Sequence, residues 1–151
     1  MTVDEIMTAN PAVVTPNDDL TAVAGIMRDR DVGIVPVVTD RRSMKLAGVI
    51  TDRDIVLRRL AEGIFTDGTA EDVMTRGDLA VAYLSDEVHE VLALMREAQV
   101  RRIPVVDELD RLVGIVAQAD VARYLGPDEP AEIERLLEAL SEPPMERVGR
   151  G

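Results

Sequence analysis

Apolar residues recur at intervals of three and four in two stretches of the chain, one after Asn17 and the other after Ser85. This spacing places them on one face of a helix, so it predicts an amphipathic helix over residues 17–30 and a second one beginning near residue 85. Asn17 is a suitable N-cap, and Ser85 has the same place in the second stretch. The apolar positions are Leu20, Val23, Ala24 and Met27 in the first helix and Val88, Val91, Leu92 and Met95 in the second.

Short runs rich in β-branched residues flank the first predicted helix. We expect a brief strand at residues 12–15 before it, and two strands at residues 34–38 and 46–50 after it. A further helix is expected from about residue 52 to residue 62. The unit therefore reads strand, helix, strand, strand, helix.

This unit occurs twice in the chain at a nearly constant offset. The matching strings are Glu5-Ile6-Met7-Thr8 with Asp72-Val73-Met74-Thr75, residues 32–38 with 100–106, and residues 46–50 with 112–116. A unit of about 60 residues has little core and is marginally stable alone. We therefore expect an α+β fold in which two βαββα repeats pack face to face as a pseudo-twofold disc, with clefts where they meet.

The end of the chain has a pattern of its own. Residues 126–130 interrupt the repeat with glycine and prolines, and Ile133, Leu136, Leu137 and Leu140 then follow a helical spacing. This spacing predicts a short C-terminal amphipathic helix. The expected parts are a first repeat at residues 1–66, a second repeat at residues 67–126, and a helix with a flexible tail at residues 127–151.

The amino-acid composition argues against several classes of partner and of functional site. The chain has 29 acidic and 17 basic residues and a net charge of −12, so it repels phosphate backbones and anionic lipids, and we expect neither nucleic acid nor a membrane as partner. It has no cysteine and one histidine, which argues against disulfides, thiolate catalysis and zinc sites. We therefore predict a cytoplasmic protein that is not an enzyme, with no catalytic residues and no metal site.

The repeated unit resembles the CBS domain, and the whole of residues 3–125 resembles a tandem CBS pair, or Bateman module. The resemblance rests on the strings given above and on Gly-Val-Ile-Thr-Asp-Arg-Asp-Ile at residues 48–55 with Gly-Ile-Val-Ala-Gln-Ala-Asp-Val at residues 114–121. Among small stand-alone CBS proteins, the bacterial hypoxic-response type is the nearest likeness, because of the Thr-Asp-Arg-Asp-Ile-Val and Val-Arg-Arg sequences.

The resemblance implies a regulatory sensor without an obligatory cofactor. Its ligand would be AMP, ADP, ATP or S-adenosylmethionine, bound in the cleft between repeats and reported to an effector protein. The resemblance also implies a homodimer, for which the stripes led by Leu20 and Val88 would supply the face. The alternative is a stress-associated structural or interaction protein with degenerate, ligand-free pockets, an interpretation motivated by Ala117.

Thr51 and Asp54 match the family's ribose-binding motif, and a carboxylate can accept hydrogen bonds from both ribose hydroxyls. The same two residues also fit a helix capping box, and both roles can hold together. Arg53 lies beside them and is a candidate for contact with phosphate, although an exposed position on its helix is the alternative.

The second repeat departs from this motif, because Ala117 stands where the first has Thr51, while Asp120 is retained. Alanine is a poor N-cap, so the helix that begins there is less stable by about 1 kcal/mol than it would be with Ser or Thr at this position. We therefore predict unequal sites, with the better one at Thr51 and Asp54. Arg101 and Arg102 stand where the family often has a phosphate-binding cation, and a solvated surface pair is the alternative.

The remaining members of the predicted ligand-binding set are apolar. The resemblance implies that they line the adenine pocket. The alternative is that they pack in the hydrophobic core. They are Val14, Ile34, Val35, Pro36, Ile103 and Pro104.

Overall fold

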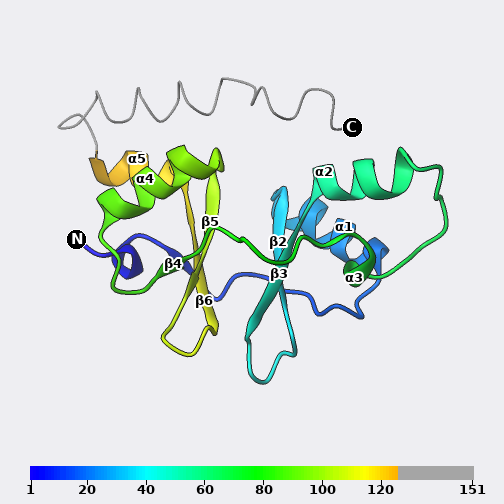
Figure 1. Ribbon diagram of the computed structural model, residues 1–151, viewed down its shortest axis with the longest axis horizontal. Helices are drawn as coiled ribbons and strands as arrows, with labels where there is room; N and C mark the ends of the chain where they lie inside the picture. The colour runs from blue at the N-terminus through cyan, green and yellow to red at the C-terminus, as the bar shows by residue number, and fades with distance from the viewer. Residues whose placement is uncertain (126–151) are drawn as a thin grey trace.

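The computed structural model describes residues 1–125, and the predicted helix at residues 133–140 lies outside them (Figure 1). None of the helices in this part of the chain is long and apolar enough to cross a membrane. In chain order the elements are η1 (Val3–Glu5), β1 (Thr8–Ala9), α1 (Leu20–Arg30), β2 (Ile34–Val38), β3 (Leu46–Thr51), α2 (Asp52–Ile55), η2 (Val56–Leu60), α3 (Ala70–Val73), β4 (Ala82–Tyr83), α4 (Val88–Ala98), β5 (Arg102–Val106), β6 (Leu112–Ala117) and α5 (Gln118–Leu125).

The elements form two similar halves that lie side by side (Figure 1). In one half β2 pairs antiparallel with β3, and Ile34 lies opposite Thr51. In the other half β5 pairs antiparallel with β6, and Arg102 lies opposite Ala117. Each hairpin has one irregularity at the same place, before its last pair. The duplication and the α+β class predicted from the sequence are confirmed.

Each half has its own buried core, and both cores have the same composition. Branched aliphatic side chains from the hairpin pack against the long helix of that half. In the first half the core is formed by Val14, Leu20, Val23, Val35, Val37, Ile50, Ala70, Val73 and Met74. In the second half it is formed by Val3, Ala82, Val88, Val91, Leu92, Met95, Ile103, Val105, Val116, Val121 and Leu125.

Each core also contains residues from a short segment that is adjacent in sequence to the other half, so the two halves exchange these segments. Val3, on η1 at the start of the chain, is fully buried in the core of the second half, and its N–H donates to the carbonyl of Asp86 at 2.9 Å. Conversely, Ala70 and Val73 of α3 are buried in the core of the first half. The short segment that precedes each half in the sequence therefore completes the core of the other half.

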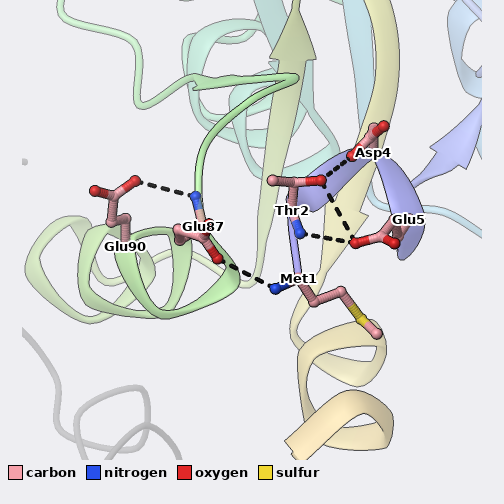
Figure 2. A network of polar contacts seen from close by, with 6 residues as sticks. All are labelled: Met1, Thr2, Asp4, Glu5, Glu87 and Glu90. Atoms are coloured by element: carbon pink, nitrogen blue, oxygen red, sulfur yellow. Dashed lines mark hydrogen bonds and ion pairs between the residues drawn. The ribbon is translucent and has the colours of Figure 1, made fainter.

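The N-terminal segment is held at the start of α4 by polar contacts (Figure 2). The Met1 amine lies 3.3 Å from a carboxylate oxygen of Glu87, and the Glu87 N–H donates to Glu90 Oε2 at 3.0 Å. Thr2 N–H donates to Glu5 Oε2 at 2.9 Å, which closes the first turn of η1. Of these contacts only the Met1–Glu87 ion pair joins the segment to the second half, together with a hydrogen bond from Val88 N–H to the Met1 carbonyl at 3.2 Å, and a surface ion pair of this kind contributes little by itself.

The exchange requires two backbone crossings, and a glycine lies at each. Thr75 pairs with Val49 through hydrogen bonds of 2.8 and 3.1 Å, and β1 pairs with β6 in the same way. A Cβ atom on Gly48 would lie 2.5 Å from the carbonyl oxygen of Thr75, and one on Gly114 would lie 2.9 Å from that of Thr8. Only glycine allows the crossing segment to approach this closely.

The predicted N-cap at Asn17 is wrong. Helix α1 begins at Leu20 with Asp19 as its N-cap, and the Asp19 side chain makes no capping hydrogen bond; the first-turn N–H of Thr21 donates to Asp67 Oδ1 at 3.2 Å. The nearby Asp18 instead accepts hydrogen bonds from the N–H and hydroxyl of Thr15 at 3.0 and 3.1 Å. Asp86 closes the equivalent turn by accepting from Tyr83 N–H at 2.9 Å. The acidic residues therefore shape the turn before each helix, because their side chains compete for backbone donors.

Three further expectations need correction. The strand expected at residues 12–15 is reduced to one bridge between Val14 and Val37. The helix expected over residues 52–62 consists of the four-residue α2 and a π-helical turn, η2. In addition, Leu20 and Val23 of the first stripe and all four residues of the second are buried in the cores, so these side chains do not supply a dimer face; Ala24 is exposed.

Gly48→Ala tests the crossing. We expect it to lower the free energy of unfolding by about 1–3 kcal/mol, because the methyl group meets backbone atoms that cannot move independently. Gly25→Ala is the control: it lies inside α1, its nearest neighbour would be 3.9 Å away, and it should be neutral or stabilising by up to about 1 kcal/mol. Urea denaturation measures both, and equal stability of Gly48→Ala and wild type would contradict the account.

Candidate functional site: two clefts between the halves

Two clefts lie where the halves meet, and the repeat relates them. The Asp54 cleft, with a volume of about 570 Å³, is lined by Ile34, Val49, Thr51, Arg53, Asp54, Leu57, Arg58, Thr75, Asp78, Leu79, Ala80, Ala98, Gln99, Val100, Arg102 and Pro104. The Asp120 cleft, with a volume of about 500 Å³, is lined by Thr8, Ala9, Asn10, Pro11, Ala12, Ile26, Arg30, Val32, Ile34, Val35, Arg102, Ile115, Ala117, Ala119, Asp120 and Arg123. Each cleft combines a strand-to-helix junction of one half with the end of the long helix of the other half.

The junction at Thr51 forms a complete capping box. Thr51 Oγ1 accepts a hydrogen bond from Asp54 N–H at 3.0 Å, and Asp54 Oδ2 accepts one from Thr51 N–H at 2.9 Å. The capping interpretation of this pair is thus confirmed. The second carboxylate oxygen, Oδ1, has Arg58 at 3.9 Å as its ion-pair partner, beyond hydrogen-bond distance. This oxygen is the acceptor that the junction leaves for a molecule in the cleft.

The junction at Ala117 differs in two ways. Asp120 Oδ2 accepts from Ala117 N–H at 2.8 Å, but alanine has no hydroxyl to return a bond, so half of the capping box is missing. Asp120 Oδ1 accepts a hydrogen bond from Arg123, and this side chain of Asp120 is only 9% exposed. Both oxygens of Asp120 are therefore occupied, whereas one oxygen of Asp54 is not.

Arginine side chains give each cleft its positive charge. Arg58 is fixed, because it donates to the carbonyls of Val73 and Met74 at 2.8 and 3.0 Å. By contrast, the side chains of Arg30, Arg53 and Arg102 make no hydrogen bond or ion pair with any other described residue. These three guanidinium groups are the cations available for an anion in the clefts, Arg30 in the Asp120 cleft, Arg53 in the Asp54 cleft and Arg102 in both.

The structure divides the residues predicted from the sequence into three groups. Ile34, Thr51, Arg53, Asp54, Arg102 and Pro104 come together in the Asp54 cleft. Ile34, Val35, Arg102 and Asp120 come together in the other. Val14, Pro36 and Ile103 are buried and are not among the lining residues, and neither is Arg101, which is exposed.

Sequence reasoning missed several lining residues. Arg58 lies four residues after Asp54, a spacing that places both on one helical face, so the pattern contained a usable signal. Arg123 has the similar i, i+3 relation to Asp120. Arg30 and residues 98–100 gave no such signal, because they reach a cleft only through the way in which the two halves meet.

Comparison with known proteins identifies the repeat. The model of the CBS domain family matches residues 3–61 and again residues 70–127. A curated relative, Hypoxic response protein 1 of Mycobacterium tuberculosis, is 40% identical over 124 residues, which cover 82% of this chain and 85% of that protein.

Solved structures agree with the fold. The structure of Hypoxic Response Protein I with two coordinated zinc ions has a TM-score of 0.73 at 40% identity, covering 83% of this chain and 100% of that one. CBSX2 in complex with AMP has a TM-score of 0.69 at 29% identity, covering 82% and 94%. The CBS domain pair of MJ0100, in complex with 5′-methylthioadenosine and S-adenosyl-L-methionine, has a TM-score of 0.72 at 30% identity, covering 85% and 98%.

The zinc ions of the first neighbour do not fit the residues found here. This chain has no cysteine and a single histidine. Within residues 1–125 there is no group of three or more His, Cys, Asp or Glu side chains that could hold a metal ion. The clefts offer the Asp54 Oδ1 acceptor, apolar walls and guanidinium groups that have no partner in the described part of the chain, and this combination suits an organic anion.

Proposed function

Because the chain belongs to the CBS domain family and carries two copies of that domain, we propose that it is a non-catalytic regulatory protein that binds an adenosyl ligand between them. The structural neighbours in complex with AMP and with S-adenosyl-L-methionine support this class of ligand. In this proposal the ligand acts by binding one conformation of the protein better than another, since a ligand with equal affinity for both shifts nothing. The changed population would be read by an effector protein in the cytoplasm.

The observation that carries the proposal is the hydrogen bonding of the two carboxylate oxygens of Asp54. Its Oδ2 is held by the capping box with Thr51, which fixes the carboxylate, and no residue among 1–125 donates a hydrogen bond to its Oδ1. A fixed carboxylate with one unused oxygen, in a cleft of about 570 Å³, is suited to accept hydrogen bonds from ribose hydroxyls. The Asp54 side chain is 16% exposed, so a hydrogen bond there is partly shielded from water.

The other walls of the Asp54 cleft fit the remaining parts of a nucleotide. Leu79, Ala80 and Val100 provide apolar surface for a purine base. Arg53 and Arg102 are unpaired among the described residues and can bind phosphate through two donors each. Unpaired cations favour AMP, ADP or ATP over S-adenosylmethionine, whose sulfonium group carries a positive charge. We therefore propose an adenine nucleotide as the ligand.

We further propose that the Asp54 cleft binds more tightly than the Asp120 cleft. In the Asp120 cleft a ligand must displace Arg123 from the carboxylate, and it finds no hydroxyl at position 117. These same features support the alternative function, an interaction protein whose pockets have lost their ligand. The two functions differ in the Asp54 cleft, where the alternative predicts no binding at all.

A homodimer is also part of the proposal, and exposed apolar residues suggest its face. Five large apolar side chains on η2 and in the loop after it have exposed fractions from 39% to 80%. We name this surface the η2 patch; it consists of Val56, Leu57, Leu60, Ile64 and Phe65. Leu60, Ile64 and Phe65 line one surface hollow, and a cluster of exposed apolar side chains is typical of an interface. Leu57 also lines the Asp54 cleft, so a second copy at this patch would adjoin a bound ligand.

Asp54→Ala tests the ligand site. A nucleotide present at about 100 times its dissociation constant stabilises the folded protein by roughly 2.7 kcal/mol, and thermal unfolding detects this shift. We expect AMP, ADP or ATP to raise the melting temperature of the wild type. In Asp54→Ala the shift should fall to the smaller contribution of the Asp120 cleft.

Asp72→Ala is the matched control for this experiment. Asp72 stands in the equivalent place of a capping box and accepts the same hydrogen bond, from Thr69 N–H at 2.9 Å, but it lines neither cleft. Both variants should lose about 1 kcal/mol of capping energy, and only Asp72→Ala should keep the full shift with nucleotide. Failure of every adenosyl ligand to stabilise the wild type would contradict the proposal and support the ligand-free alternative.

Phe65→Lys tests the dimer. Phe65 is 80% exposed, so the substitution should not disturb the core, but it places a charge in the η2 patch. We expect sedimentation velocity to give a dimer for the wild type and a monomer for Phe65→Lys. Leu109→Lys, at a position that is 61% exposed but distant in sequence from the patch, should remain a dimer. A monomeric wild type, or a dimeric Phe65→Lys, would exclude the proposed face.

A further inference from the structure

We propose that the two clefts are antagonistic for anionic ligands because they share one guanidinium group, that of Arg102. This inference rests on the proposed function, since it concerns two nucleotides in the two clefts. It adds a regulatory property: occupation of one cleft lowers the affinity of the other. The protein would then respond mainly to its first bound nucleotide.

Two residues line both clefts, Ile34 and Arg102. They are equivalent positions of the repeat, because each is the first residue of its hairpin and each lies opposite the last residue of the paired strand, Thr51 or Ala117. A symmetrical duplication would place two cations, or two apolar residues, between the clefts. This chain has one of each, so two clefts depend on a single central cation.

Arg102 is free to serve either cleft. Among the described residues its guanidinium has no hydrogen-bond or ion-pair partner, whereas Arg58 is bonded to two carbonyls and Arg123 to Asp120. A guanidinium that binds phosphate with two parallel donors is committed to that phosphate. Because Arg58 and Arg123 are already bonded, the second nucleotide has only one uncommitted cation of its own cleft, Arg30 or Arg53. It also meets the negative charge of the first nucleotide across a shared wall.

The antagonism is specific for charge. A neutral ligand such as adenosine needs no guanidinium, so its two binding steps should be independent. For AMP, losing one charge-assisted contact should raise the dissociation constant of the second step by roughly tenfold or more. Steric exclusion between the clefts would instead affect adenosine and AMP alike.

Calorimetric titration of single-cleft variants separates coupling from the intrinsic difference between clefts. Asp54→Ala leaves the Asp120 cleft to be measured alone, and Asp120→Ala leaves the Asp54 cleft alone. If the clefts are coupled, AMP binds the Asp120 cleft of Asp54→Ala about tenfold more tightly than it binds as the second ligand of the wild type. With adenosine the two values should agree.

Two substitutions at the shared positions test the role of Arg102. Ile34→Arg supplies the second central cation at the equivalent place, and we expect it to bring the two AMP steps of the wild type closer together. Arg102→Ile reproduces the residue found at position 34, and it should weaken AMP at both clefts while leaving adenosine unchanged. Arg101→Ile is the matched control, because Arg101 is adjacent, exposed and absent from both linings, and it should behave as the wild type.

The outcomes are distinct. A second AMP step that is weaker than the isolated cleft, together with independent adenosine steps, supports the proposal, and so does AMP binding to one cleft where adenosine binds two. If AMP binds each cleft of the wild type with the dissociation constant found in the single-cleft variants, the coupling is overturned but the proposed function stays intact. Equal antagonism for adenosine also overturns it. Absence of binding by both ligands overturns the proposed function and the coupling together.

Discussion

The structure depends on the close backbone contact that each half makes with the segment preceding the other. Val3 closes the core of the second half, and Ala70 with Val73 closes that of the first. Each connecting chain must cross a central strand, and Gly48 and Gly114 make room for it. Because neither core is complete without the exchange, the halves are held in a fixed relation, and the two clefts between them acquire a defined shape.

The duplication provides two clefts, but a few substitutions give them different chemistry. Thr51 completes a capping box that Ala117 cannot, and Arg123 bonds the carboxylate of Asp120, whereas Leu57 holds the equivalent position near Asp54. These replacements are on exposed or half-buried positions, where packing places little restriction on the side chain. The scaffold is therefore symmetrical while the linings are not. We propose that this asymmetry gives the two clefts different affinities for a regulatory nucleotide.

The sequence could predict features that are local or periodic. The hairpins and the box at Thr51 depend on residues close in sequence, the repeat shows as a nearly constant offset between matching strings, and all three were predictable. The exchange of η1 was not, because the pattern around Val3 is the same whichever core it enters. For a related reason, the sequence could not predict what covers the stripe led by Leu20. An amphipathic pattern indicates that a helix face is buried, but not whether the core of the same chain or a second copy buries it. Likewise, the presence of Arg102 in both clefts follows only from the tertiary arrangement.

The central claim is that a nucleotide binds with its ribose at Asp54. A titration of the ¹⁵N-labelled protein with AMP, followed by two-dimensional NMR, tests it most directly, because every backbone amide reports its own surroundings. The account predicts that the first and largest shifts belong to residues lining the Asp54 cleft, among them Arg53, Asp54, Ala80 and Val100. An unchanged spectrum at saturating AMP, or shifts confined to a surface outside both clefts such as the η2 patch, would contradict it.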